Sequence, residues 1–275
     1  MQKGGIYVTF EGVCAVLKDA GIEDYRFEAR VLLEEYCGFV SSERDYDCPE
    51  LAAALEKRAQ HYPLQYILGK WEFYGLEFKV NENCLIPRAD TETVIETARK
   101  LLPRGARICD LCAGSGCIGI TLLKLYPDAV CDAVELYPKT LDIAIENARL
   151  NGVSERYNPI CADVLAGGCI SGKYNAIISN PPYIRKDVLK SLSDEVKKEP
   201  VAALDGGEDG LVFYRAILDL YADNLADGGV FIFEIGYDQA DALKILSAER
   251  GMDCKIIKDL GGRDRVAVIT RGVMA

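Results

Sequence analysis

The feature that most constrains the fold is an alternation of strand-like and helix-like segments that starts at Thr91 and continues toward the C-terminus. Short apolar runs such as 129–134 and 174–179 are separated by longer segments whose apolar residues recur every three or four positions. Strands joined in this way form a mostly parallel sheet, because each crossover helix returns the chain to the same end of the sheet. We therefore predict an α/β fold with helices on both faces of the sheet and ligands bound beyond the carboxyl ends of the strands.

The segment before Thr91 follows different patterns. Three stretches near the N-terminus place apolar side chains at helical spacing, namely 10–21, 24–39 and 48–60. Gly21 and Gly38 fall where the first two patterns end, as C-terminal caps do. These features predict a small helical domain over residues 1–68.

Residues 69–90 predict a β-hairpin linker, because aromatic and β-branched residues alternate there with polar ones around Gly75. The linker contains the only tryptophan, Trp71, followed closely by Phe73 and Tyr74. We expect these rings to pack at the joint with the main domain, which spans residues 91–275.

Composition narrows the class of protein. The net charge of −11 opposes non-specific attraction to DNA or RNA, so we expect no direct nucleic-acid contact. We find neither a membrane-spanning run nor a signal-peptide pattern, and we expect a monomeric cytoplasmic protein. The eleven cysteines are scattered through apolar runs and predict reduced thiols. Cys109 and Cys112 form a C-x-x-C without a second pair, and His61 is the only histidine, so we expect no metal site.

A glycine-rich loop, "DLCAGSGCIG" (110–119), lies between a predicted strand and a predicted helix. Gly114 and Gly116 permit a tight turn and a close approach of the backbone to a ligand, and amide groups at the following helix N-terminus face that ligand. This arrangement is typical of a nucleotide-type binding loop.

Acidic residues follow at the ends of successive strands. Glu135 stands 19 residues after Gly116, where an acid would hydrogen-bond a ribose diol, and Asp163 ends the third strand, near an adenine amino group. Together with Asp110 they make an anionic edge, which repels a pyrophosphate but suits the cationic sulfonium and ammonium groups of S-adenosylmethionine. The alternative for each acid alone is a solvated strand end.

The stretch "NPPY" (180–183) ends the fourth strand of this domain. An amide nitrogen is a poor nucleophile, and methylating it requires acceptors that hold its hydrogens. The side-chain oxygen of Asn180 and the backbone carbonyl of Pro181 can supply them, while Tyr183 can stack on the flat group. No histidine base is needed, because the extra proton can pass to water.

Taken together, these motifs resemble the class I methyltransferases that modify exocyclic or amide nitrogens. The surrounding stretches at 63–92, 199–218 and 228–239 are similar to those of the protein-(glutamine-N5) methyltransferases that act on peptide chain release factors. The resemblance runs from about Pro63 to the C-terminus, whereas the N-terminal helices match in helical character and length only. Cys112 stands where the family often has glycine, and Ala89 where it usually has proline.

The resemblance implies a Rossmann-like, seven-stranded sheet and an enzyme that converts S-adenosylmethionine into S-adenosylhomocysteine. It implies transfer to the glutamine of a Gly-Gly-Gln motif in a release factor, gripped partly by the helical domain. The implied cofactor residues are Asp110, Cys112, Ala113, Gly114, Ser115, Gly116, Glu135, Asp163, Val164 and Asn180. The implied substrate residues are Asn180, Pro181, Pro182 and Tyr183.

Two other acceptors remain open at this point. An N6-adenine DNA or RNA methyltransferase uses the same tetrapeptide on a flipped base, although the acidic balance counts against it. A ribosomal-protein glutamine methyltransferase would need almost the same chemistry. A non-catalytic nucleotide-binding protein and a nicotinamide dehydrogenase fit the residues less well.

Overall fold

The computed structural model describes residues 7–38, 40 and 46–272. The chain forms two compact units, each described separately below. The helical unit comprises the chain up to Lys70 together with Ser193–Lys198, and the sheet unit comprises Trp71–Leu192 and Glu199 onward.

The helical unit packs four helices around an apolar core. They are α1 (Phe10–Asp19), α2 (Tyr25–Cys37), α3 (Pro49–Ala59) and α4 (Leu64–Leu68), and two short strands, β1 (Tyr7–Val8) and β2 (Tyr46–Asp47), pair antiparallel. Thr9 caps α1 by accepting a hydrogen bond from the Gly12 amide at 3.0 Å, and Gly38 ends α2 in the left-handed conformation. The three predicted helices are therefore confirmed, and α4 is an additional helix inside the segment where the aromatic alternation begins.

Arg58 attaches the distant segment 193–198 to the helical unit. Its guanidinium is buried on α3, donates to the Glu28 carboxylate at 2.9 Å and donates to the Glu195 carboxylate at 2.6 Å. A buried charge is tolerated when it is paired and hydrogen-bonded, as it is here.

The hairpin consists of β3 (Lys70–Phe73) and β4 (Leu76–Lys79). Tyr74 and Gly75 connect the strands with positive φ angles of 53° and 72°, the conformation that tight hairpin turns require. Phe73 and Phe78 are almost completely buried, pack edge to face with centroids 6.1 Å apart and belong to the core of the sheet unit. These two rings therefore anchor the hairpin to the sheet unit.

A seven-stranded sheet forms the centre of the sheet unit, in the order β10-β11-β9-β8-β5-β6-β7. Its strands are β5 (Arg107–Leu111), β6 (Val130–Glu135), β7 (Tyr157–Cys161), β8 (Tyr174–Ser179), β9 (Leu225–Glu234), β10 (Met252–Lys258) and β11 (Asp264–Arg271). The strands β5 to β9 run parallel to one another, whereas β11 is antiparallel to both β9 and β10. The predicted mostly parallel α/β sheet is confirmed.

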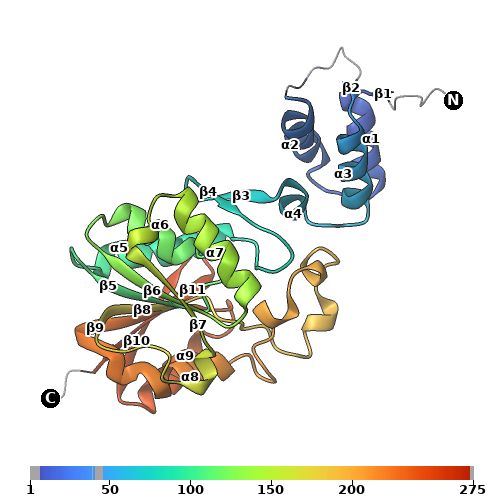
Figure 1. Ribbon diagram of the computed structural model, residues 1–275. Helices are drawn as coiled ribbons and strands as arrows, with labels where there is room; N and C mark the ends of the chain where they lie inside the picture. The colour runs from blue at the N-terminus through green and yellow to red at the C-terminus, as the bar shows by residue number, and fades with distance from the viewer. Residues whose placement is uncertain (1–6, 39, 41–45, 273–275) are drawn as a thin grey trace. The chain divides into compact units, whose positions relative to one another are not determined.

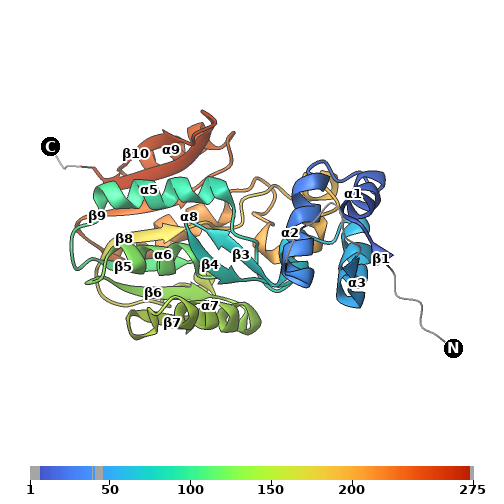
Figure 2. The same cartoon turned by 90° about the horizontal axis from the view of Figure 1, so that it is seen from above.

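Helices cover both faces of this sheet (Figure 1). One face carries α5 (Glu92–Leu101), α6 (Cys117–Leu125) and α7 (Pro138–Leu150), and the other carries α8 (Val212–Tyr221) and α9 (Ala240–Ala248). The view from above shows α5 running along the sheet on the first of these faces (Figure 2). Short 3₁₀ turns occupy Ala89–Thr91, Ser154–Arg156, Val164–Ala166, Leu189–Ser191, Val196–Lys198, Val201–Ala203 and Ala222–Asn224.

The alternation along β9 assigns its side chains to the two faces. Phe231 and Phe233 pack in the core with α8 and α9, and Ile232 packs in the core with α5, α6 and α7. Glu234 lies two residues after Ile232, and side chains two residues apart in a strand point to the same face. The strand therefore directs the Glu234 carboxylate toward the face that carries α5. Within residues 7–38, 40 and 46–272, no helix has the length and apolar character needed to cross a bilayer.

Candidate active site

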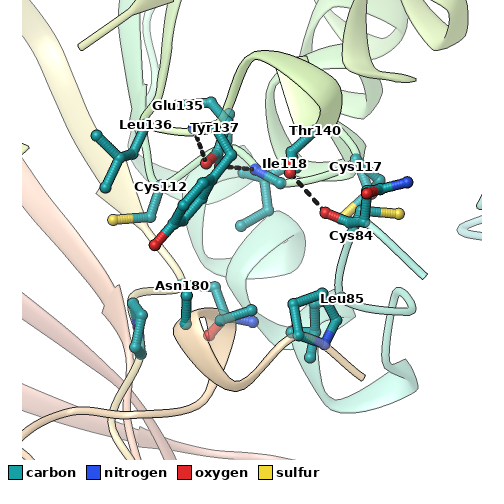
Figure 3. Close-up of a pocket in the computed structure, with 18 of the residues that line it drawn as sticks. Cys84, Leu85, Cys112, Cys117, Ile118, Glu135, Leu136, Tyr137, Thr140 and Asn180 are labelled. Atoms are coloured by element: carbon teal, nitrogen blue, oxygen red, sulfur yellow. Dashed lines mark hydrogen bonds between the residues drawn. The ribbon is translucent and has the colours of Figure 1, made fainter. Parts of the chain in front are cut away.

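A cavity of about 190 Å³ lies beyond the carboxyl ends of the parallel strands of the sheet unit. Most of its wall comes from residues 83–88 after the hairpin, the glycine-rich loop, the ends of β6 and β7, the NPPY segment, and Pro200, Ala202 and Ala203. Figure 3 shows Glu135 and Cys112 on one side of this space and Asn180 on another. The topology therefore gathers most of the predicted site residues in one place.

The glycine-rich loop supplies Cys112, Ala113, Gly114 and Ser115 to the cavity wall. Gly116 follows as the N-cap of α6 with a φ of 80°. A Cβ added there would lie 2.8 Å from the Tyr157 hydroxyl and 2.8 Å from Ile120, so glycine is required for the helix to pack on the sheet. Gly116 thus supports the cavity from behind and does not line it.

Glu135, at the end of β6, holds the backbone on this side of the cavity. Its carboxylate accepts hydrogen bonds from the amides of Gly114 and Tyr137, both at 3.0 Å (Figure 3). Burial raises the pKa of Glu135, and these amide hydrogen bonds oppose the rise. Glu135 lines the cavity and fixes the shape of the loop at the same time.

Asp163 and Val164 line the cavity from the end of β7. The Asp163 carboxylate accepts a hydrogen bond from the Leu165 amide at 2.8 Å and caps the short 3₁₀ turn that follows. Two of the three predicted acids, Glu135 and Asp163, therefore face the cavity.

Asp110, the third predicted acid, lies beneath the glycine loop and is not among the residues that line the cavity. It is completely buried, accepts a hydrogen bond from the Gly119 amide at 2.9 Å, and burial raises its pKa to about 7. Among the described residues, its second carboxylate oxygen has no hydrogen-bond partner, and neither have the hydroxyls of Thr121 and Tyr157. The structure thus brings Asp110 to the α6 side of the sheet, away from the other two acids.

The NPPY segment contributes Asn180 and Pro182 to the cavity wall. Pro181 is buried, and the hydroxyl of Ser179 anchors the preceding strand end by donating to the Leu111 carbonyl at 2.6 Å. Tyr183 does not line the cavity: its ring packs against the core that contains α8 and α9, and its hydroxyl donates to Glu234 at 3.2 Å. The stacking role of Tyr183 stays a prediction, and the contacts of this side chain are with Glu234 and the α8–α9 core.

Several residues that the sequence reasoning did not single out complete the site. Leu136 and Tyr137 follow Glu135, Thr140 donates to the Asn83 carbonyl at 2.5 Å, and Thr91 lies at the start of α5. Glu199, almost fully buried, accepts from the Ile86 amide at 3.1 Å and pairs with Arg88. An acid at the end of an apolar strand, the signal that identified Glu135, would also have identified Glu234.

The chemistry of this wall fits a cationic nucleoside cofactor. Arg88 is the only basic side chain among the described lining residues, and it is ion-paired with Glu199. Glu135 and Asp163 add carboxylates, and apolar side chains such as Ile118 and Leu165 add flat contact surface. Such a wall attracts a sulfonium and opposes a pyrophosphate.

The described part of the chain holds no group of three or more His, Cys, Asp or Glu side chains that could bind a metal ion. All eleven cysteines are free thiols, including Cys109 and Cys112. Burial raises the pKa of Cys112 and Cys117, and raises that of Cys84 to about 11, so these thiols stay protonated at neutral pH.

The fold and the cavity define a methyltransferase. Residues 90–216 match the family model described as a methyltransferase small domain. Among solved structures, the sheet and its helices resemble a methyltransferase from Pyrococcus furiosus, with a TM-score of 0.56, 17% identity and coverage of 73% of this chain and 91% of that one. The hMettl16 catalytic domain, solved with an RNA hairpin, matches with a TM-score of 0.59 and 15% identity over 82% of this chain and 80% of that one.

The chain belongs to the release factor glutamine methyltransferase family. It is 38% identical to the release factor glutamine methyltransferase of Clostridium botulinum, over 91% of this chain and 94% of that protein. It is also 38% identical to the protein of the same name from Geobacter sulfurreducens, over 91% of each. The model of the PrmC N-terminal domain matches residues 11–69. The family resemblance predicted from the sequence motifs is confirmed, and it extends into the N-terminal helices.

Proposed function

We propose that the chain transfers a methyl group from S-adenosylmethionine to the side-chain amide nitrogen, N5, of the glutamine in the Gly-Gly-Gln motif of peptide chain release factors. The observation that carries this proposal is the cavity on which the glycine loop, Glu135 and Asn180 converge, in a chain of this family. When bound, S-adenosylmethionine supplies a methyl group on a positively charged sulfur and leaves as neutral S-adenosylhomocysteine.

The cofactor is held, in this proposal, by the loop Cys112–Gly116, by Glu135, by Asp163 with Val164, and by Asn180. Glu135 would accept hydrogen bonds from the ribose hydroxyls of the bound cofactor, and Asp163 would accept from its adenine amino group. Asp110 acts indirectly, because its carboxylate holds the Gly119 amide in the first turn of α6 and lies outside the cavity wall.

Asn180 and Pro181 hold the substrate amide. The side-chain oxygen of Asn180 and the carbonyl of Pro181 accept the two amide hydrogens, which returns electron density to nitrogen as the methyl group arrives. Pro182 gives rigid contact surface, and Tyr183 stiffens the segment through its bond to Glu234. The proton lost by the product passes to water, so the reaction needs no histidine.

The helical unit, whose PrmC N-terminal domain match covers residues 11–69, contributes to recognition of the release factor in this proposal. In this proposal the chain acts as a monomer in the cytoplasm. It binds no nucleic acid directly, because its net charge of −11 opposes attraction to phosphates.

A methyl-transfer assay with labelled cofactor tests the acceptor. Purified release factor, a ribosomal protein and duplex DNA are offered separately, with a release factor whose Gly-Gly-Gln glutamine is replaced by alanine as the control. We expect label on the intact release factor only. Label on DNA alone would rule out the glutamine, and label on the control protein would rule out this particular glutamine.

A further inference from the structure

Three side chains from distant parts of the chain, at the end of β9, at the start of α5 and in the NPPY segment, form a continuous series of hydrogen bonds. Glu234, only 1% exposed, accepts a hydrogen bond from the Thr91 hydroxyl at 2.6 Å. The Thr91 oxygen in turn accepts a hydrogen bond from the side-chain NH2 of Asn180 at 3.3 Å. Glu234, Thr91 and Asn180 all belong to the sheet unit, and we call them the Glu234 relay.

The hydrogen-bonding capacity of these groups gives the relay a single direction. Both oxygens of Glu234 receive a hydroxyl donor, from Thr91 and from Tyr183, as an ionised carboxylate would. Thr91 has one hydroxyl hydrogen, which it donates to Glu234. Toward Asn180 the Thr91 oxygen can therefore only accept a hydrogen bond. Asn180 must therefore present its NH2 to Thr91.

This constraint decides which end of the Asn180 amide is available for substrate. The oxygen and the nitrogen of an amide point away from the same carbon in different directions, so an NH2 held by Thr91 leaves the oxygen free to turn elsewhere. Within the described part of the chain, the bond to Thr91 is the one side-chain hydrogen bond that Asn180 makes. Its oxygen remains free to accept a hydrogen of an incoming amide.

Neighbouring contacts hold the relay in place. The Arg265 guanidinium, 6% exposed, pairs with Asp90 at 3.0 Å and with Asp259 at 3.2 Å, and Asp90 directly precedes Thr91. Burial raises the pKa of Glu234, and the positive charge of Arg265 opposes the rise. A buried carboxylate that is fully hydrogen-bonded and near an arginine is a rigid support.

We propose that Glu234 and Thr91 are positioning residues for the transfer: they orient Asn180 so that its oxygen, and not its NH2, faces the glutamine amide. This inference rests on the proposed function. It predicts that the relay favours a methyl-accepting substrate that presents an NH2 group. In the opposite orientation, the NH2 of Asn180 would face the NH2 of the substrate, and two hydrogen-bond donors would oppose each other.

The test compares Thr91→Val with Thr121→Val. Both changes remove a hydroxyl from a buried threonine of the sheet unit, but the Thr121 hydroxyl has no partner among the described residues. We expect Thr91→Val to lower kcat for release factor about 30-fold, with KM and the cofactor Kd within about threefold. We expect Thr121→Val to keep kcat within about twofold, and Thr91→Ser, which retains the hydroxyl, to keep most of the activity.

A second readout does not depend on activity. In protein labelled with ¹⁵N-asparagine, the NH2 signals of Asn180 are identified by their absence in Asn180→Ala. We expect these signals to move in Thr91→Val, which removes the oxygen that receives the NH2, and in Glu234→Gln, which changes the partner of the Thr91 hydroxyl. They should stay in place in Thr121→Val.

The outcomes separate this inference from the proposed function. Unchanged Asn180 signals in Thr91→Val, equal losses in Thr91→Val and Thr121→Val, or a Thr91→Ser variant as inactive as Thr91→Val would each overturn the relay. A wild-type protein that labels no release factor would overturn the proposed function, while the NMR comparison would still decide whether Thr91 orients Asn180.

Discussion

The two sides of the cavity are stabilised in different ways. On the glycine-loop side, carboxylates hold backbone amides: Asp163 holds Leu165 and Glu135 holds Tyr137, each 2 residues away, and Glu135 also holds Gly114, 21 residues away. On the NPPY side, side chains hold one another over 143 residues for Thr91 and Glu234 and over 89 residues for Asn180 and Thr91. The first side therefore depends on short motifs and on one contact between neighbouring strands, whereas the second depends on contacts between segments far apart in the sequence.

This difference predicts that the two sides fail separately when mutated. Changes on the glycine-loop side should alter the shape of the loop and the affinity for the cofactor. Changes on the NPPY side should alter the orientation of side chains and the rate of transfer.

Asn180→Ala should cause the largest loss of activity. Removing the side-chain oxygen removes an acceptor that acts on the amide as it reacts, and such groups contribute about a hundredfold to a thousandfold to kcat. We expect the cofactor Kd to stay within about tenfold, which corresponds to roughly 1.4 kcal/mol. Single-turnover transfer and calorimetric titration of the cofactor measure the two quantities.

A loss of cofactor affinity as large as the loss of rate would break the separation of the two sides. Asn180 would then act chiefly as a cofactor ligand.

Asp110→Asn should change how stability depends on pH. Burial raises the pKa of Asp110 to about 7 in the folded protein, whereas an unfolded aspartate has a pKa near 3.9. The folded state therefore binds more protons between these values, and wild-type stability falls as pH rises from about 4 to about 7. Asparagine does not titrate, so the variant should gain stability relative to wild type over this range, by at most about 4 kcal/mol.

Urea unfolding at pH 4, 6 and 8 measures this gain. Asp142→Asn, which changes an exposed acid on α7, is the matched control and should follow the wild-type curve. Parallel curves for Asp110→Asn and wild type would mean that Asp110 is ionised in the folded protein at neutral pH.

Glu135→Ala should weaken cofactor binding by about 30-fold, or roughly 2 kcal/mol. The change removes the proposed ribose acceptor and also releases the amides of Gly114 and Tyr137, which Glu135 holds at 3.0 Å. At saturating cofactor, kcat should fall far less than in Asn180→Ala, because the NPPY side is intact. Calorimetric titration measures the affinity, and Asp142→Ala controls for the loss of a negative charge.

An unchanged cofactor affinity in Glu135→Ala would show that the ribose lies elsewhere. A kcat loss as large as that of Asn180→Ala would show that the two sides of the cavity are coupled.

The same contrast explains what the sequence could predict. Periodicity identified the strands of the large sheet, the hairpin and the longer helices, because these depend on neighbours within a few residues, but it missed the five-residue helix α4. The glycine loop, Glu135 and Asp163 were recognisable because each belongs to a short motif at a strand end. Asp110 shares that position, but β5 turns its side chain toward α6, and spacing along the chain does not show which face a strand end presents.

The NPPY side could be predicted only in part. Asn180 was identified from its motif, but its partner Thr91 lies 89 residues earlier, and no local pattern links the two. Tyr183 was expected to stack on the substrate amide, and no sequence pattern indicated that its ring packs against the α8–α9 core or that its hydroxyl donates to Glu234, 51 residues later. Long-range hydrogen bonds of this kind follow from the sheet order, which periodicity does not specify.

Cys112→Gly should have the smallest effect, and its sign tests how the glycine loop is stabilised. Cys112 has a φ of 59°, a left-handed conformation that costs a residue with a Cβ about 1 kcal/mol. Glycine relieves this strain but gains freedom in the unfolded chain, so we expect the free energy of unfolding to change by less than about 0.5 kcal/mol. Gly114→Ala introduces the same strain at a φ of 56°, where a Cβ meets no atom within 4 Å, and should destabilise by about 1 kcal/mol. If Cys112→Gly destabilised the protein as much as Gly114→Ala, contacts of the cysteine side chain, and not backbone conformation, would dominate at this position.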